Sequence, residues 1–339
     1  MKRGFAILSF LLGMICMAQQ IQLINSEKSG VSFRGLSVVS DSVLWVGGNK
    51  GTIGKSTDGG NSFQWFSPAG FEDRDFRAIA GFDKQTAVVI AVASPAVILK
   101  TKDGGKNWME VYRDEHPDVF LDDMSFYSED LKNGIVVGDP IDGAAYFLQT
   151  HDGGESWTRI EELNSVPLAE DEAFFAASNS NIKMTDENTF MIVSGGGASH
   201  LIVTGMYIQN VALPKSDSNT SGANGMDYSK DQKYGLIVGG DFMNPKSSAN
   251  NLLVFEFSKD GLPQISKPQN PPSAYKSGVA ILDDGKAISC GMTNVAFSKD
   301  KAQNWETIST IGFHSCKKAR FGNKVFLAGS DGKIGMLIE

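Results

Sequence analysis

The sequence predicts an all-β fold, a seven-bladed β-propeller with four-stranded antiparallel blades whose ring is closed by the N-terminal strand. Two observations lead to this prediction. A short motif recurs at spacings of 45 and 49 residues, and the last part of the chain has room for only three strands of a blade. Repeats of about 40–50 residues are typical of propellers, in which each blade is a four-stranded sheet.

The motif is Ser/Thr-x-Asp-x-Gly-x-Ser/Thr/Asn-aromatic, and four segments align with it without gaps. They begin at Ser56, Thr101, Thr150 and Ser298, with alanine at the glycine position of the last copy, and a degenerate fifth copy begins at Ser258. The aspartates of the third and fourth copies are 148 residues apart, which is close to three further periods. The motif therefore marks successive blades, some of which have lost it.

The aspartate of each motif is predicted to be structural. An aspartate side chain accepts hydrogen bonds from the backbone N–H groups that follow it and closes a tight turn, and glycine supplies positive φ at little cost. The closing aromatic residue can then pack between neighbouring sheets. These structural residues are Asp58, Asp103, Asp152 and Asp300.

The blades can be placed around the motifs. We expect them at about 34–67, 77–113, 120–161, 174–213, 225–266 and 278–309, followed by three strands within 314–339. Apolar and polar residues alternate around residues 21–23, as in a half-buried strand. We expect this strand to complete blade seven, because an open ring would leave an exposed edge. The alternative is a six-bladed ring with an unpaired C-terminal hairpin.

Residues 1–18 have the features of a secretory signal peptide. Lys2 and Arg3 precede an apolar stretch, and residues 16–18 fit a small-x-small cleavage site. The apolar stretch is too short to span a bilayer, which needs about 20 residues. We therefore expect one propeller domain at residues 19–339, secreted or periplasmic, without membrane insertion.

Composition limits the partners. The formal net charge of −8 argues against nucleic acid. The mature chain has two cysteines, Cys290 and Cys316, which we expect to be buried free thiols, with one disulfide as the alternative. We expect a monomer.

Two families share these features. The motifs resemble the Asp-box (BNR) repeats of sialidase-like propellers. The blade pattern in residues 33–60 is similar to that of photosystem-II assembly-factor (Ycf48/HCF136-like) propellers. Further stretches resemble a bacterial branch often labelled "oxidoreductase" or "glycosyl hydrolase"; they are 121–125, 138–143, 172–179, 239–245 and 275–279. The resemblance implies a propeller and, from the assembly factors, a protein partner bound at a basic patch.

Topology sorts the polar residues into two faces. The motif turns share one face, while the starts of first strands and the ends of second strands share the other, which we call the top. A funnel at this face is where a ligand site is expected. The predicted ligand-binding residues are Arg34, Arg77, Asp123, Asp139, Asp241, Lys276 and His314.

Catalytic chemistry has weaker support. Asp139, Glu172 and Asp122 could pair as the acid and base of a glycosidase. Sialidase chemistry needs three arginines on one carboxylate, and only Arg34 and Arg77 are expected at the funnel. The histidines and cysteines lack metal-site spacing, and no dinucleotide fingerprint occurs. We predict no metal and no cofactor.

The sequence thus predicts a secreted binding or scaffold propeller, either an assembly factor for an envelope protein or a glycan recogniser. The alternative is a glycoside hydrolase or lyase that uses the carboxylates of the top face.

Overall fold

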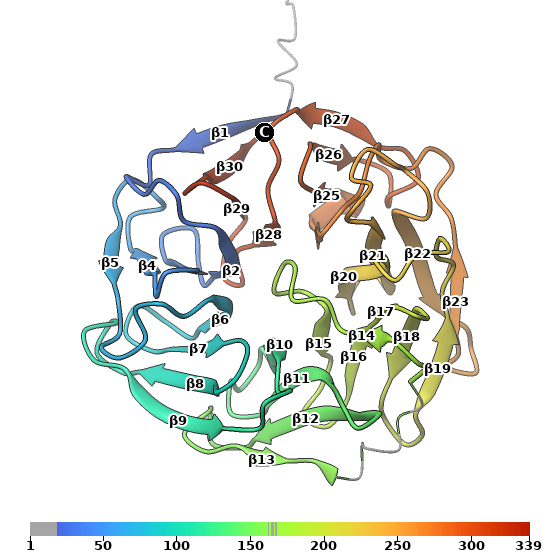
Figure 1. Cartoon of the computed structure of the whole chain (residues 1–339). Helices are drawn as coiled ribbons and strands as arrows, with labels where there is room; N and C mark the ends of the chain where they lie inside the picture. Colours follow the sequence, from blue (N-terminus) through green and yellow to red (C-terminus); the bar gives the residue numbers. More distant parts are fainter. Residues whose placement is uncertain (1–18, 162, 164–165, 167) are drawn as a thin grey trace, which may run out of the picture.

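The computed structural model describes residues 19–161, 163, 166 and 168–339, so the predicted signal peptide lies outside the described residues. Seven antiparallel sheets surround a central channel like the blades of a propeller (Figure 1). The predicted fold class is confirmed.

The first three blades follow the chain in order. Blade one consists of β2 (Phe33–Val38), β3 (Leu44–Gly48), β4 (Ile53–Ser56) and β5 (Gln64–Phe66). Blade two consists of β6 (Phe76–Gly81), β7 (Ala87–Ala91), β8 (Ala96–Thr101) and β9 (Met109–Asp114). Blade three consists of β10 (Leu121–Phe126), β11 (Gly134–Ile141), β12 (Ala144–Thr150) and β13 (Thr158–Arg159).

The next three blades repeat this arrangement. Blade four consists of β15 (Ile182–Met184), β16 (Phe190–Val193), β18 (His200–Val203) and β19 (Gln209–Ala212). Blade five consists of β20 (Ser221–Ser229), β21 (Tyr234–Asp241), β22 (Leu252–Phe257) and β23 (Pro263–Ser266). Blade six consists of β24 (Gly278–Ile281), β25 (Ala287–Cys290), β26 (Val295–Ser298) and β27 (Glu306–Ser309), with the short turn η2 (Asp283–Gly285) between its first two strands.

Blade seven joins the two ends of the chain. It consists of β28 (Ser315–Lys318), β29 (Val325–Ala328), β30 (Ile334–Ile338) and β1 (Gln20–Ile24), with β1 on the outside (Figure 1). The register runs from Gln20 opposite Ile338 to Ile24 opposite Ile334. The N-terminal strand therefore closes the ring, as predicted, and the six-bladed alternative is excluded.

The hydrophobic core lies between neighbouring blades. Between blades one and two, Trp45 meets Trp108 edge-on at 6.2 Å between ring centroids and lies beside Phe66 at 6.5 Å. Edge-to-face contacts at this distance are favourable beyond the apolar area they bury. Trp108 is the aromatic residue that closes the motif of blade two, so the motif contributes to the core as well as to the turn.

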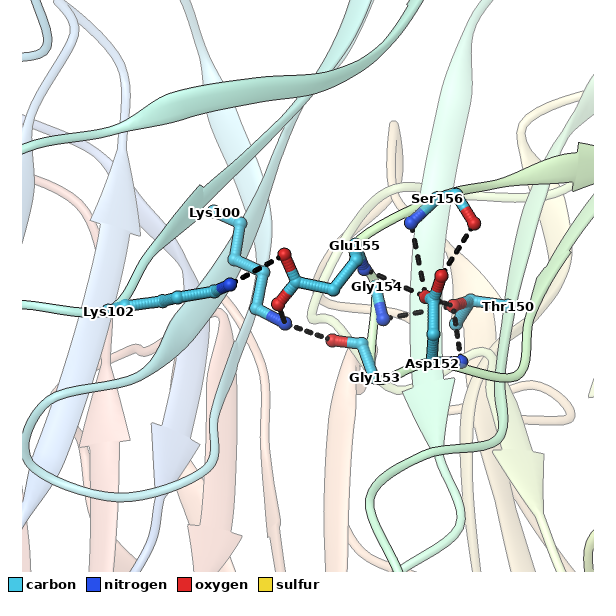
Figure 2. A network of polar contacts seen from close by, with 8 residues as sticks. All are labelled: Lys100, Lys102, Thr150, Asp152, Gly153, Gly154, Glu155 and Ser156. Atoms are coloured by element: carbon cyan, nitrogen blue, oxygen red, sulfur yellow. Dashed lines mark hydrogen bonds and ion pairs between the residues drawn. The ribbon is translucent and has the colours of Figure 1, made fainter.

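The motif turns are built as the sequence indicates. In blade three, the Asp152 carboxylate accepts hydrogen bonds from the Thr150 hydroxyl (2.7 Å), the Ser156 hydroxyl (2.6 Å) and the backbone N–H groups of Glu155 and Ser156, while the Gly154 N–H donates to Thr150 (Figure 2). Burial opposes ionisation, but the hydrogen bonds from Ser156 and Thr150 outweigh it and lower the pKa of Asp152. The carboxylate is therefore a structural acceptor.

A lysine before each of the first two motifs links neighbouring blades. Buried Lys100 donates to the carbonyl of Gly153 (2.8 Å) and pairs with Glu155 (2.5 Å), which also pairs with Lys102 (Figure 2). Lys55 likewise donates to the carbonyl of Gly104 in the motif of blade two, at 2.7 Å. Each lysine thus ties the third strand of its blade to the next motif turn.

The motif of blade six departs from the glycine pattern. Asp300 still accepts from Ser298 and Asn304, as in the other copies. However, Lys301 and Ala302 adopt φ values of 54° and 62°, where the other motifs have glycine. The side-chain bonds of Asp300 hold the turn although two non-glycine residues are in the left-handed region.

Blade four begins at Ile182 rather than near Phe174. Residues before it form β14 (Glu172–Ala173), which pairs with β17 (Gly195–Gly196), and β17 in turn pairs with β20 of blade five. The intervening residues leave the blade and reach into the centre of the ring (Figure 1). The predicted loss of the motif in blade four is confirmed, because β18 and β19 are joined by residues 204–208 without it.

Cys290 and Cys316 are buried free thiols in the core between blades six and seven. Within the described part of the chain, His, Cys, Asp and Glu side chains nowhere gather in a group of three or more that could hold a metal ion. No helix in that part is long and apolar enough to cross a membrane.

Candidate functional site

A cavity of about 480 Å³ lies at the top of the channel, where the first strands begin. Five of the predicted site residues line it: Arg34, Arg77, Asp122, Asp139 and His314. They come from blades one, two, three and seven. The propeller topology therefore brings together Arg34 and His314, which are 280 residues apart in the sequence.

The floor of the cavity is formed by residues 174–181, between β14 and β15. This segment fills the channel, and we call it the plug. Its residue Asn179 accepts hydrogen bonds from the backbone N–H groups of Leu36 (3.3 Å) and Ile79 (3.0 Å) and donates to Asp123 (2.6 Å). One side chain therefore joins the first strands of blades one, two and three. Asn179 also lines a second cavity at the opposite mouth, so the plug separates the two ends of the channel.

Two arginines form one wall. Arg34 donates to the carbonyl of Ala177 in the plug (3.1 Å), and in the described residues no carboxylate lies within ion-pair distance of it. Burial and, secondly, the charge of Arg77 lower the pKa of Arg34. Arg77 is itself paired with Asp75 (2.7 Å) and lies over the ring of Phe120 (5.7 Å). Arg34 thus forms no ion pair among the described residues, whereas Arg77 does.

Two carboxyl groups from blade three, which adjoins blade two, form the neighbouring part of the wall. Asp122 is 1% exposed, and neither of its oxygens has a hydrogen-bond partner among the described residues. Burial and the neighbouring carboxyl groups of Asp139 and Asp123 raise its pKa well above the usual value. Asp139 accepts from the backbone N–H of Phe174 (2.9 Å), and burial raises its pKa to about 6.

The remaining lining is mainly apolar. Phe175 meets Phe242 edge-on at 5.5 Å, and Met243, 73% exposed, lies at the rim. Tyr275 is buried and donates to Asn224 (2.7 Å). Apolar walls with a few convergent polar groups are typical of ligand sites.

Residues 75–200 match the family model of the photosystem II assembly factor YCF48. This stretch of 126 of the 339 residues is similar to that family of BNR-repeat propellers. No curated protein sequence shows a significant match to it.

Solved structures resemble this chain over almost its whole length. YCF48 bound to a D1 peptide has a TM-score of 0.64 at 14% identity, covering 95% of each chain. YCF48 from Cyanidioschyzon merolae has a TM-score of 0.65 at 14% identity, covering 94% of this chain and 98% of the other. The extracellular domain of the putative one-component system BT4673 from B. thetaiotaomicron has a TM-score of 0.61 at 13% identity. The match covers 93% of this chain and 39% of the other. At such identities the likeness shows the fold.

Four predicted site residues lie outside the cavity or hold other parts of the fold together. Buried Asp123 accepts from Asn179 and from the backbone N–H groups at the start of β15. Fully buried Lys276 donates to Ser273 and Asn294, and burial lowers its pKa to about 8.

Glu172 and Asp241 also have internal partners. The Glu172 carboxylate accepts from the Ser194 hydroxyl and the backbone N–H of Ala169 (2.8 Å), and it contacts Nδ1 of His200 at 2.7 Å. Glu172 therefore anchors the base of the plug. Asp241 accepts from Thr220 and the N–H of Met243 in the turn after β21.

The plug was not recognised from the sequence, although residues 172–179 stood out as a matching stretch. The sequence feature that could have revealed it is that apolar and polar residues do not alternate in residues 174–181, as they would in a half-buried strand. The aromatic lining was also missed, because apolar residues in loops carry no spacing that marks a cavity.

Proposed function

We propose that this propeller binds a segment of a protein partner in the top cavity and acts as an assembly or scaffold factor. The half-buried Arg34, which forms no ion pair among the described residues, carries this proposal. A buried cation is stabilised by a bound carboxylate, and arginine can take a carboxylate through two parallel hydrogen bonds. The aromatic walls suit the apolar side chains of the same segment.

Two further observations support this choice. The similar YCF48 structure holds a D1 peptide, which is a protein segment. Residues 1–18 have the pattern of a secretory signal peptide. We therefore place the partner outside the cytoplasm, in the cell envelope.

The test begins with cross-linking of the mature protein, residues 19–339, in the native envelope fraction. Cross-linked peptides identified by mass spectrometry name the partner segment, whose affinity is then measured directly with a synthetic peptide. We expect Arg34→Met to weaken binding by at least about tenfold, as the loss of one charged hydrogen-bond partner does. The matched control is Arg113→Met, on the outer strand β9, where Arg113 pairs with exposed Glu110.

Equal affinities of the Arg34→Met variant and the parent would contradict the proposal. So would cross-links confined to the outer strands of the blades. Binding of a glycan instead of a peptide, shown on a glycan array and lost in Arg34→Met, would assign the cavity to sugar recognition.

One observation favours the alternative of glycoside hydrolysis. Asp139, with its pKa raised to about 6, and Asp122 lie on one wall of the same cavity, and a raised carboxyl pKa is what a glycosidase acid requires. Hydrolysis of a glycoside by the parent but not by Asp139→Asn would establish this activity.

A further inference from the structure

Asp122 is the one side chain on the acidic wall that the folded protein leaves unsatisfied. Both of its oxygens lack a hydrogen-bond partner in the described residues, although the residue is 1% exposed and lines the cavity. Buried polar groups are nearly always paired, and an unpaired one costs free energy. Its neighbour Asp123, by contrast, uses its oxygens to hold the plug. The backbone N–H of Ala176 in the plug favours the ionised form of Asp122, but no hydrogen bond of full geometry holds either oxygen among the described residues.

The surroundings of Asp122 are acidic rather than basic. The charge of Asp139 on β11 acts on Asp122 most strongly, then that of Asp123, and only then that of Arg77, which is already paired with Asp75. Arg34 faces the cavity from blade one and donates to the plug. Two carboxyl groups on one wall, beside aromatic side chains, form an acceptor for a positive charge.

We propose that Asp122, with Asp139, accepts an ammonium or guanidinium group carried on an apolar stem. The inference rests on the proposed function in one respect, since the source it names is a lysine or arginine side chain of the bound protein segment. The cavity then recognises a segment with both charges, an acidic group at Arg34 and a basic group at Asp122. The stem of such a side chain packs on apolar walls while its charged end reaches the carboxylates.

Binding of a cation changes the protonation of the acidic wall. In the free cavity, burial and two carboxyl neighbours raise the pKa of Asp122 and so favour its protonated form. A cation favours the ionised form, so the proton is released to solvent when the cation binds. Affinity for a cation must therefore rise with pH, by up to about tenfold per pH unit while Asp122 is protonated in the free protein.

Two other titratable groups in the cavity do not contribute to this pH dependence of the affinity. Burial lowers the pKa of His314 to about 3, so its imidazole stays neutral above pH 5. Burial also raises the pKa of Tyr275, which keeps its proton. The cavity groups whose ionisation a bound cation can shift are thus the carboxyl groups of Asp122 and Asp139.

The first experiment measures the chemistry of the site without a partner protein. Mature protein is titrated with n-pentylammonium and with its neutral counterpart 1-pentanol, by calorimetry in two buffers of different ionisation enthalpy. We expect millimolar binding of n-pentylammonium with proton release, tightening from pH 5 to pH 7, and at least about tenfold weaker binding of 1-pentanol.

The decisive variant is Asp122→Asn. It is nearly isosteric with the protonated aspartate of the free protein, so it should fold, and we expect it to lose the preference for n-pentylammonium over 1-pentanol. The matched control is Asp142→Asn, an exposed carboxylate of the same face in the turn after β11. An unchanged preference in Asp122→Asn overturns the proposal, and so does proton uptake when n-pentylammonium binds, because a cation held by Asp122 favours the loss of its proton.

A second experiment tests whether the bound cation is a side chain of a protein segment or a free amine. Two capped hexapeptides are compared, each with two phenylalanines and one aspartate, one with lysine and the other with norleucine. A lysine preference of at least about tenfold that disappears in Asp122→Asn supports a protein segment. If n-pentylammonium binds through Asp122 but the lysine peptide is not preferred, the site takes a free amine, and the proposed protein-binding function fails while the cation site stands.

Discussion

At the scale of single residues, Asn179 fixes the plug to three blades, although the sequence did not single it out as a site residue. It is buried, it has a φ of 54°, and its amide bonds to three blades. Asparagine tolerates this backbone conformation better than most residues. The plug is therefore held by a residue type that fits both the backbone and the hydrogen bonds.

Replacing Asn179 separates these two contributions. We expect Asn179→Gly to lower the free energy of unfolding by about 2–3 kcal/mol, because two backbone N–H groups and the Asp123 carboxylate lose a buried partner. Asn179→Ala should lose about 1 kcal/mol more, because alanine is strained at positive φ. Urea denaturation of both variants measures the effects. A glycine variant as stable as the parent would show that water replaces the amide.

Asp139 gives a pH dependence of stability whose sign follows from its raised pKa. The folded protein holds the proton up to about pH 6, whereas the unfolded chain loses it near pH 4. Because the folded state binds more protons in this window, the parent loses stability as the pH rises from 4 to 6, by about 3 kcal/mol at most.

Asp139→Asn removes this loss, since the amide does not titrate and its oxygen can still accept from the Phe174 N–H. We expect the variant and the parent to be equally stable at pH 3.5 and the variant to be more stable at pH 7. Denaturation curves at several pH values test this. A difference that does not grow between pH 4 and 6 would contradict the raised pKa.

At the scale of elements, the Asp-box turn shows how a sequence motif can specify local structure. The positions of Asp58, Asp103, Asp152 and Asp300 predicted the turns because each bond in the motif joins residues at most four apart. The plug depends instead on bonds between blades, and such contacts have no fixed spacing in the sequence. Local turns were therefore predictable, and the floor of the cavity was not.

The fourth motif offers a test of the strain in these turns. Lys301 is exposed and has a φ of 54°, where the first three motifs have glycine. We expect Lys301→Gly to raise the free energy of unfolding by about 1 kcal/mol, because glycine is not strained at this φ. Lys299→Gly, two residues earlier and without positive φ, should lower it slightly through the greater freedom of the unfolded chain. Equal effects of the two substitutions in urea denaturation would exclude strain at Lys301.

At the scale of the whole molecule, the number of blades and the closure of the ring were predictable, whereas the composition of the site was predictable only in part. Repeats and edge pairing follow general rules, so the three-stranded C-terminal segment required a strand from the N-terminus. The topology then placed Arg34, Arg77, Asp122, Asp139 and His314 in one cavity. Whether a polar residue near a strand end points into the cavity or into the framework, as Asp122 and Asp123 do, depends on packing that the sequence does not display.

Ring closure by β1 can be tested by removing and restoring the strand. Ile24 is half-buried in the core between blades seven and one, while Leu23 is 50% exposed. We expect Ile24→Ala to lower the free energy of unfolding by about 2–3 kcal/mol and Leu23→Ala to change it by less than about 0.5 kcal/mol.

A chain that begins at Ser26 should lose more stability than Ile24→Ala, because β30 then has an open edge, and this edge should promote self-association. A synthetic peptide of residues 19–25 should restore the melting temperature in a saturable manner and suppress the association, since it binds only the folded ring. A peptide carrying Ile24→Asp should not restore it. If the shortened chain is as stable and monomeric as the parent without peptide, β1 covers the edge of blade seven but is not needed to close the ring.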